Sequence, residues 1–308
     1  AYAVGGWNVD SIGLVDGATI TEASDQSFTV DAVDATVSIA GESATTTALD
    51  VTVASDVTSL TVSSANSAVV SVTADSVIGT LAIGPVDTTI VAGADVTVDA
   101  MTVDAGAKLV LSGSGDVSIV YDADIAEIDA SGLTGALEIT GFAATVDVED
   151  FLADVLVYSG ELSIVGAADN NLELTADELE AFAAVEVTGA GGLTLSGLTG
   201  ADYAADASLL TAQLAKVTAD TGTVTLEGKV GASFTFTEDQ LVDGIVEDEV
   251  VGYEIAVEAT GTGTVTVTEV GRTNEVGQKL ADLGGKITVG VDGGVNLVAT
   301  KDSSFEIA

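Results

Sequence analysis

The sequence contains no cysteine, no histidine and only one proline among its 308 residues. Without cysteine the chain cannot form a disulfide, a thiolate nucleophile or a zinc–thiolate site. Without histidine it lacks the side chain that most often transfers protons near neutral pH. Aromatic residues make up 4% of the chain, so large rings contribute little to its core. These absences remove the usual catalytic groups, and we expect a protein that is not an enzyme.

Positive charge is scarce as well, because seven Lys and Arg residues stand against 49 Asp and Glu, for a formal net charge of −42. The first basic residue is Lys108. Nucleic-acid binding requires Lys and Arg to displace counterions from phosphates, so nucleic acid is excluded as a partner. An anionic membrane would repel the chain for the same reason. Such a charge strains a compact fold unless salt screens it or divalent cations neutralise it, which predicts a saline or calcium-containing cell exterior.

The sequence also lacks a long apolar run. The longest uncharged stretch, 57–74, is rich in Ser and Thr and alternates as a β-strand does, which predicts no direct membrane insertion. The sequence opens AYA without Met, as we expect of a mature chain after removal of a secretion signal. We therefore expect an extracellular or cell-surface location.

Small aliphatic residues supply most of the 47% hydrophobic content, and they favour a thin, stacked core over a wide globular one. Over residues 1–146, short Val, Ile, Leu and Thr runs such as TSLTVSS, AVVSVTA and DVTVDA alternate with Gly, Ala-Ser and Asp turns. Their length and spacing indicate an all-β repeat region, either a β-solenoid or a Greek-key sandwich. Asp-Gly and Asn-Gly hairpin turns are rare there, which favours an elongated solenoid with about 20 residues per turn and six or seven rungs.

Residues 147–308 follow a different pattern, in which a short helix precedes a pair of strands and the unit repeats. Two predicted helix starts carry capping boxes, Thr175-Ala-Asp-Glu178 and Thr237-Glu-Asp-Gln240. The predicted helices are Asp147–Asp154, Thr175–Ala184, Asp206–Lys216, Thr237–Val246 and Asn274–Leu283. Because one such unit cannot bury its apolar face alone, we expect these helix and strand-pair repeats to stack. The fold class predicted is therefore mainly β, with two regions.

The stretch IDASGLTGALEITG (128–141), its echo GGLTLSGLTG (191–200) and the phrases LTADELEAF, LLTAQLAKV and FTEDQLVDG carry a resemblance to known proteins. In these segments the chain resembles bacterial surface-layer proteins and secreted repeat adhesins of the hemolysin type. The resemblance implies secretion, assembly and calcium dependence. The calcium nonapeptide G-G-x-G-x-D-x-U-x of the hemolysin group is absent, and Gly113-Ser-Gly-Asp116 is only a partial echo of it.

Clusters of carboxylates are the candidate metal ligands. Calcium takes six to eight oxygen ligands, and carboxylates one or two residues apart at a strand end can share an ion with backbone carbonyls. A solvated turn or helix end is the alternative for each cluster. The candidates are Asp122, Asp124 and Asp129; Asp147, Glu149 and Asp150; Asp169; and Glu247, Asp248 and Glu249.

The chain ends are candidate assembly contacts, because a solenoid has unpaired backbone groups at its first and last rungs. Tyr2 and Trp7 lie in an apolar N-terminal segment, and Phe305 lies in a strand-like C-terminal one. We therefore expect a structural protein that assembles with itself into a surface layer or filament. The alternatives are a calcium-dependent adhesin or ligand-binding repeat module and, with less support because aromatic sugar platforms are scarce, a polysaccharide-active β-helix enzyme.

Overall fold

The chain is mainly β and consists of two compact units. The computed structural model describes residues 2–3, 12–23, 27–41, 49–63, 67–84, 87–142, 148–158, 160–168, 170–189, 191–198, 214–219, 223–237, 245–246, 249–250, 254–259, 264–270 and 286–299. Unit 1 comprises residues 1–141 and 149–163, and unit 2 comprises residues 142–148 and 164–308. The chain therefore crosses between the units at 141/142, 148/149 and 163/164, and the domain boundary at 146/147 stays a prediction.

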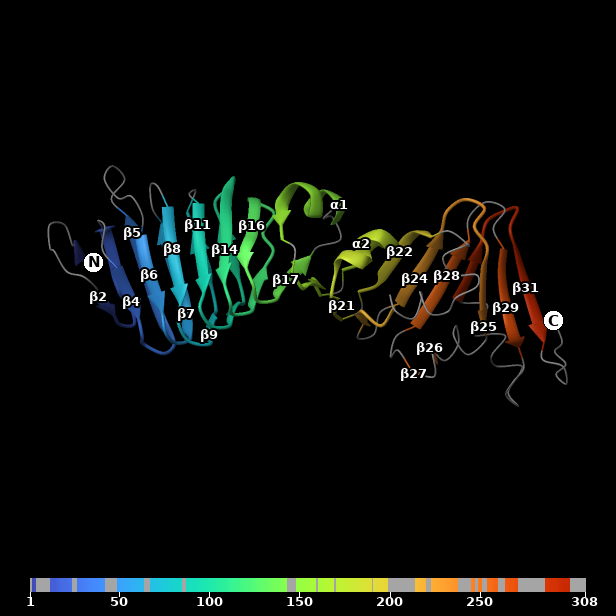
Figure 1. The fold of residues 1–308 in the computed structure, drawn as a ribbon, viewed down its shortest axis with the longest axis horizontal. Helices are drawn as coiled ribbons and strands as arrows, with labels where there is room; N and C mark the ends of the chain where they lie inside the picture. Colours follow the sequence, from blue (N-terminus) through green and yellow to red (C-terminus); the bar gives the residue numbers. More distant parts are fainter. Residues whose placement is uncertain are drawn as a thin grey trace. The chain divides into compact units, whose positions relative to one another are not determined.

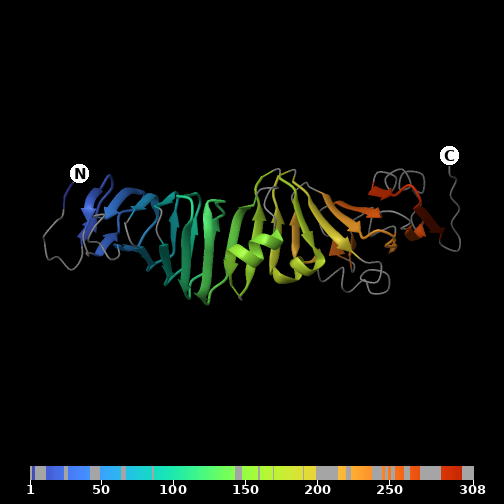
Figure 2. The same cartoon turned by 90° about the horizontal axis from the view of Figure 1, so that it is seen from above.

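Unit 1 is a parallel β-solenoid of about seven turns, as the sequence predicts. Its strands follow one another from blue to green (Figures 1 and 2) and form two sheets, A and B. The part of sheet A before β19 (Leu162–Gly166) contains β1 (Tyr2–Ala3), β3 (Thr19–Ala23), β5 (Ala35–Gly41), β7 (Val57–Ser63), β9 (Ser76–Ile78), β10 (Leu81–Ile83), β12 (Val96–Val98), β13 (Met101–Val103), β15 (Val117–Val120) and β17 (Leu137–Phe142). Sheet B contains β2 (Ile12–Leu14), β4 (Ser27–Val30), β6 (Leu49–Val53), β8 (Ser67–Val72), β11 (Asp87–Ala92), β14 (Ala107–Gly113), β16 (Ile125–Leu133) and β18 (Leu156–Val157).

The period of unit 1 follows from its strand register. Ser67 of β8 pairs with Asp87 of β11, and Val96 of β12 pairs with Val117 of β15. The sequence separation of these partners is the length of one turn, and it agrees with the turn length that the sequence predicts. Each turn contributes one strand to sheet B and then one or two short strands to sheet A.

The core of unit 1 is built from columns of aliphatic side chains. In β8 the buried residues alternate with half-buried ones, because successive side chains of a strand point to opposite faces. Parallel pairing in register then places each buried side chain above its equivalent in the next turn. One column consists of Phe28, Val51, Val70, Ile90 and Leu111, none of which is more than 1% exposed. Burial of each such side chain stabilises the fold by about 1.5–3 kcal/mol.

Unit 2 is also built mainly from parallel strands, but most of its repeats contain more residues than a turn of unit 1. Its elements are β20 (Leu172–Thr175), α2 (Ala176–Ala181), β21 (Ala184–Val187), β22 (Leu193–Leu198), β23 (Val217–Ala219), β24 (Thr223–Gly228), β25 (Phe234–Thr237), β26 (Ile245–Val246), β27 (Glu249–Val250), β28 (Glu254–Ala259), β29 (Thr264–Val270), β30 (Ile287–Val289) and β31 (Gly294–Ala299). Leu193 pairs with Val224, and Val224 pairs with Ile255, so each of these repeats is about half as long again as a turn of unit 1. Strand β19 (Leu162–Gly166) lies where the two units divide.

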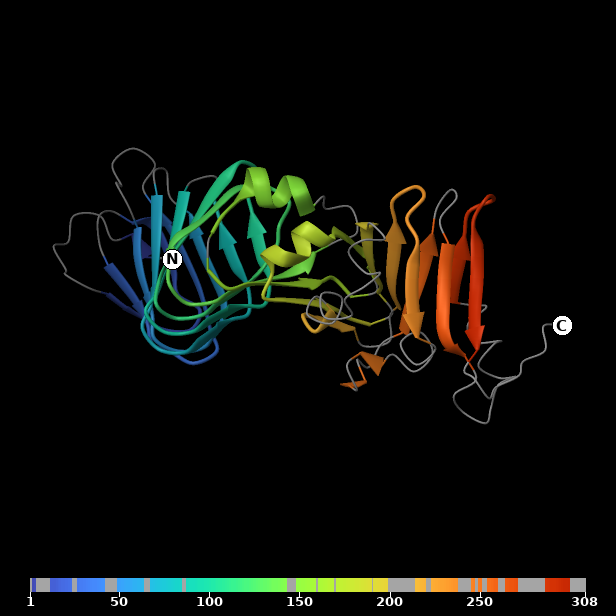
Figure 3. The same ribbon diagram turned by 45° about the vertical axis from the view of Figure 1, so that its right-hand side comes forward.

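Most strands of unit 2 belong to two further sheets, whereas β21 and β23 pair in parallel as the last strands of sheet A. Strands β20, β22, β24, β28 and β30 form sheet C, and strands β25, β29 and β31 form sheet D, drawn in orange and red in Figure 3. The short strands β26 and β27 pair antiparallel. Buried columns continue here, as where Leu195 lies between Leu174 and Leu226.

Two of the five predicted helices fall among the described residues. Helix α1 (Val148–Asp150) continues as a five-residue π-helix, η1 (Phe151–Val155), and α2 begins after Thr175 with the capping box that the sequence predicts. The Thr175 hydroxyl accepts a hydrogen bond from the Glu178 amide, and the Glu178 carboxylate accepts one from the Thr175 amide. The helices predicted over Asp206–Lys216, Thr237–Val246 and Asn274–Leu283 lie largely outside the described residues. The prediction of a helix over Thr237–Val246 is wrong at its last two residues, Ile245 and Val246, which form strand β26.

Candidate functional site

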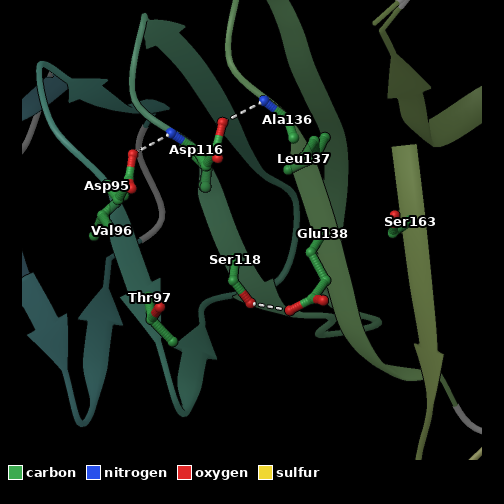
Figure 4. A pocket seen from close by; sticks show the side chains of 10 residues that line it. Asp95, Val96, Thr97, Asp116, Ser118, Ala136, Leu137, Glu138 and Ser163 are labelled. Carbon is green, nitrogen blue, oxygen red and sulfur yellow. Dashed lines mark hydrogen bonds between the residues drawn. The ribbon is translucent and has the colours of Figure 1, made fainter. Parts of the chain in front are cut away.

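A ladder of aspartates lines one corner of unit 1, just before the strands of sheet A. Each of these carboxylates accepts a hydrogen bond from a backbone amide one turn later in the chain. The Asp95 carboxylate accepts from the Asp116 amide at 2.9 Å, and the Asp116 carboxylate accepts from the Ala136 amide at 2.8 Å (Figure 4). The full corner ladder consists of Asp16, Asp56, Asp75, Asp95 and Asp116.

The corner ladder ties consecutive turns together at the place where the chain leaves the regular sheet pairing. Asp75, Asp95 and Asp116 occupy equivalent places in three consecutive turns, because Ser76, Val96 and Val117 pair in register. Neighbouring strands lie about 4.8 Å apart, so these exposed carboxylates repel one another unless ions screen them. The ladder thus concentrates negative charge along one edge of the solenoid.

A shallow groove of about 350 Å³ lies next to this ladder, on the outer face of sheet A. Its polar lining comes from three successive turns of unit 1 and from β19 (Figure 4). The Ser118 hydroxyl donates a hydrogen bond to the Glu138 carboxylate at 2.7 Å. The polar groups that line the groove are Asp95, Thr97, Asp116, Ser118, Glu138 and Ser163. Carboxylates and hydroxyls in this arrangement suit a neutral polyhydroxylated ligand or a cationic one, whereas they repel an anion.

The predicted metal ligand Asp129 lies in an ion pair. Lys108 of β14 donates to Glu127 at 2.7 Å and to Asp129 at 3.2 Å, both on the neighbouring strand β16. The pKa of Lys108 is raised, chiefly by its hydrogen bond to Glu127 and then by that to Asp129. The Ser131 hydroxyl and amide donate to Asp129 at 2.6 and 3.1 Å, and with Lys108 they lower the pKa of Asp129. The pairing of β14 with β16 therefore places the Lys108 ammonium beside the carboxylates of Glu127 and Asp129.

Among the described residues, the other predicted metal ligands are not grouped with Asp129. Asp122 accepts a hydrogen bond from the amide of Asp124 at 2.9 Å, which forms a tight turn before β16. Asp150 is exposed at the end of α1, and Glu149 and Glu249 belong to α1 and β27. Asp147, Asp169, Glu247 and Asp248 lie outside the described residues. Within the described part of the chain no three acidic side chains are grouped as a metal site would require, and calcium binding stays a prediction.

Two tyrosines near the end of unit 1 anchor its last turns. The Tyr158 hydroxyl donates to the Gly135 carbonyl at 2.6 Å, and the Tyr121 ring meets the Phe151 ring edge to face with centroids 5.2 Å apart. Burial raises the pKa of both tyrosines, and the carboxylates near them raise it further. These contacts fix the η1 segment against the solenoid, a packing role that the sequence pattern does not reveal.

The last described rung of unit 2 is open to solvent. Val265 and Val267 of β29 are fully buried, whereas the partner of Val265, Val295 of β31, is 44% exposed. Val291, in the turn between β30 and β31, is completely exposed, and Val298 is 48% exposed. Of the predicted assembly residues, Tyr2 belongs to strand β1, and Trp7 and Phe305 lie outside the described residues.

None of the helices in the described residues has the length and apolarity of a membrane span. A search against protein-family models found no match, and comparisons with curated proteins and with solved structures likewise found none.

Proposed function

We propose that the chain is an extracellular structural protein, a self-assembling subunit of a surface layer or filament. The observation that carries this proposal is the stacking of parallel strands in both units. A stack of parallel strands repeats its backbone donors and acceptors along one direction, so its outermost strands offer the same pattern to another chain. A protein with this geometry needs only complementary end strands to polymerise.

The charge distribution supports a location at the cell exterior. The corner ladder places Asp75, Asp95 and Asp116 in consecutive turns, and the chain as a whole carries a charge of −42. This arrangement is stable where salt screens the carboxylates. A saline medium outside the cell supplies that screening.

We propose as well that the longer repeats of unit 2 each carry a short helix, stacked on the helices of neighbouring repeats. Helix α2 lies along the chain between the paired strands β20 and β22, so even a repeat no longer than a turn of unit 1 accommodates a short helix. Leu172 pairs with Leu193 but Leu193 pairs with Val224, so the strand register widens at the second pair. The additional residues fall where the sequence predicts the next helix, Asp206–Lys216. Circular dichroism of residues 164–308 against residues 1–163 would test this, if both fragments fold, through the difference in helical signal.

Divalent cations are the proposed ligands of the acidic surface. An ion that binds only the folded chain stabilises it by RT ln(1 + [L]/Kd), about 3 kcal/mol at a hundredfold excess over Kd. Calcium at constant ionic strength should therefore raise the melting temperature or promote assembly, and chelation should reverse both effects. An unchanged melting temperature and assembly state would contradict this part of the proposal.

A second candidate function, a ligand-binding repeat module or adhesin, is favoured by the groove beside the corner ladder. Glu138 and Ser118 offer a hydrogen-bonding pair on its floor. Calorimetry with neutral oligosaccharides and with polyamines would detect such a ligand, and Glu138→Ala should weaken its binding. The matched control is Asp50→Ala, an exposed carboxylate on the outer face of sheet B.

The principal test is whether the purified 308-residue chain assembles in high salt. Sedimentation and electron microscopy should detect ordered polymers that grow with protein concentration and whose spacing repeats. A chain that stays monomeric at every salt and calcium concentration tried would contradict the proposed function.

A further inference from the structure

Exposed apolar side chains concentrate toward the two ends of the described chain. Eight large hydrophobic side chains are exposed among the described residues, and all eight are valines. Val15 and Val33 lie in the first turns of unit 1, and Val291, Val295 and Val298 lie in the last rung of unit 2. The others are Val77, Val157 and Val230. Exposed apolar groups at both ends are available for contacts with another chain.

Strand register shows that the last rung exposes residues of the buried core columns. Val295 pairs with Val265, which is 0% exposed, and Leu297 pairs with Val267, also 0% exposed. In sheet C, Ile287 pairs with Val257, which is 1% exposed, whereas Ile287 itself is half-buried. The last rung, formed by β30 and β31, therefore exposes side chains whose counterparts in β28 and β29 are buried.

The sequence of β31, the outer strand of this rung, favours pairing with another chain. β31 reads Gly-Val-Asn-Leu-Val-Ala over residues 294–299 and contains no charged residue and no proline. Solitary proteins protect such edges with lysine, proline or bulges, and a long uncharged edge strand promotes association. Among the described strands, β31 lies at the outer edge of sheet D and β30 lies at the outer edge of sheet C.

The distribution of charge along the chain favours the N-terminal end of a second copy as the partner of this rung. Six of the seven cations lie between Lys216 and Lys301, whereas the segment before Lys108 contains carboxylates alone. Two N-terminal ends would bring together carboxylates such as Asp16 and Asp34 with no cation between them. The C-terminal rung contains one cation, Lys286, and one carboxylate, Asp292, so it meets an acidic end with less repulsion.

We propose that the rung formed by β30 and β31 of one copy binds the first rung, β1 and β2, of a second copy. This inference rests on the proposed function and gives the polymer a direction. The strands continue in parallel from one copy into the next, with main-chain hydrogen bonds along the junction and valines packed across it. Because the two surfaces differ, the contact is heterologous and propagates into an open filament unless its rotation closes a ring.

Substitutions at equivalent turns test the junction. Val291 lies in the turn before β31, and Val230 lies in the corresponding turn before β25, two repeats earlier and 84% exposed. We expect Val291→Glu and Val295→Glu to raise the concentration needed for half-maximal assembly by at least about tenfold, which corresponds to about 1.4 kcal/mol. Val230→Glu should change it by less than about twofold. Circular dichroism would establish that each variant is folded.

The sign of the introduced charge tests the identity of the partner surface. A lysine at 291 faces an acidic N-terminal rung, so Val291→Lys should impair assembly less than Val291→Glu does. The opposite order, or equal effects at 291 and 230, would overturn the proposal.

Because the chain contains no cysteine, single cysteines can report the direction of the contact. Chains with Val291→Cys mixed with chains with Val15→Cys should give dimers with a short bismaleimide, and neither variant alone should do so. Cross-linking of Val291→Cys to itself would overturn the head-to-tail arrangement. Ordered polymers that form normally in every glutamate variant would contradict only this junction, whereas a wild-type chain that never assembles would contradict the proposed function itself.

Discussion

The two units form parallel strands by the same rule but differ in how much chain each repeat requires. In unit 1, Val96 pairs with Val117, whereas in unit 2, Val224 pairs with Ile255, so a repeat of unit 2 is about half as long again. Both lengths support fully buried aliphatic columns, as at Leu109 and Leu195. A rung core therefore needs only its strands in register, at either repeat length.

The two units also use the same corner bond with different chemistry. In unit 1 the Asp95 carboxylate accepts from the Asp116 amide, and in unit 2 the Asn171 side-chain oxygen accepts from the Gly192 amide at 2.8 Å. The hydrogen bond thus requires an oxygen on a short side chain but no charge. The negative charge of the corner ladder is a separate property of unit 1.

The largest expected effect comes from opening a cavity in one column of each unit. Leu109 lies between Thr88 and Ile128 in unit 1, and Leu195 lies between Leu174 and Leu226 in unit 2, and both leucines are 0% exposed. Leu109→Ala and Leu195→Ala should each lower the free energy of unfolding by about 2–5 kcal/mol. If the units unfold separately, calorimetry will detect two transitions, and each variant will lower a different one.

The exposed Thr97→Ala variant is the control for both leucines and should leave each transition in place. A single transition that both leucine variants lower equally would contradict separate unfolding of the two units.

Glycines at the corners should give the next largest effect. A Cβ at Gly115 would overlap the carbonyl oxygen of Ala94 in the preceding turn, and a Cβ at Gly191 would overlap that of Asn170. Gly115→Ala and Gly191→Ala should therefore each destabilise their own unit by about 1–3 kcal/mol, because the backbone of one turn must move. Chemical denaturation followed separately for each transition would measure this.

Gly13→Ala is the matched control, because a Cβ at Gly13 meets no atom within 4 Å. Equal destabilisation by all three substitutions would point to the loss of backbone freedom in glycine itself and against close approach at the corners.

The sequence predicts the parts of the fold that depend on neighbouring residues. The alternation in TSLTVSS and AVVSVTA predicts strands, the spacing of such runs predicts the length of a turn, and Thr175 with Glu178 predicts the cap of α2. The corner ladder was not predicted, because Asp95 looks like any turn aspartate until the register brings the Asp116 amide beside it. A recurring Asp before a strand, at 56, 75, 95 and 116, is the signal that could have indicated it.

The candidate sites depended on the same long-range information. Asp129 was predicted as a metal ligand from its neighbours Asp122 and Asp124, yet its cation is Lys108, which strand pairing brings from the preceding turn. The groove combines residues of three turns and β19, so spacing along the chain does not reveal it.

A smaller effect should separate hydrogen bonding from charge in the corner ladder. Asp95→Ala removes the acceptor for the Asp116 amide and should cost about 0.5–1.5 kcal/mol, as Asn171→Ala should in unit 2. Asp95→Asn keeps the acceptor and removes a repelling charge, so it should be neutral in high salt and stabilising in low salt. Thermal melts of the three variants at two salt concentrations would test this. If Asp95→Asn destabilises unit 1 as much as Asp95→Ala does, the charge of Asp95 is needed. The Asp95 and Asn171 hydrogen bonds would then not be equivalent.

The smallest expected effect concerns Lys108, which is the only Lys or Arg in unit 1, whereas unit 2 contains the other six. Lys108→Met should destabilise unit 1 slightly, with a loss of stability that shrinks as the salt concentration rises, because the pair with Glu127 and Asp129 is partly exposed.

The pKa of Asp129 is lowered chiefly by Ser131 and then by Lys108. The contribution of Asp129 to stability is therefore present above the unfolded carboxyl pKa and is lost as pH falls through the lowered folded value. NMR titration of the Asp129 carboxyl should give a pKa that rises in Lys108→Met and rises further in Ser131→Ala. A larger rise in Lys108→Met would make the ion pair, and not the Ser131 turn, the main reason for the ionised state of Asp129.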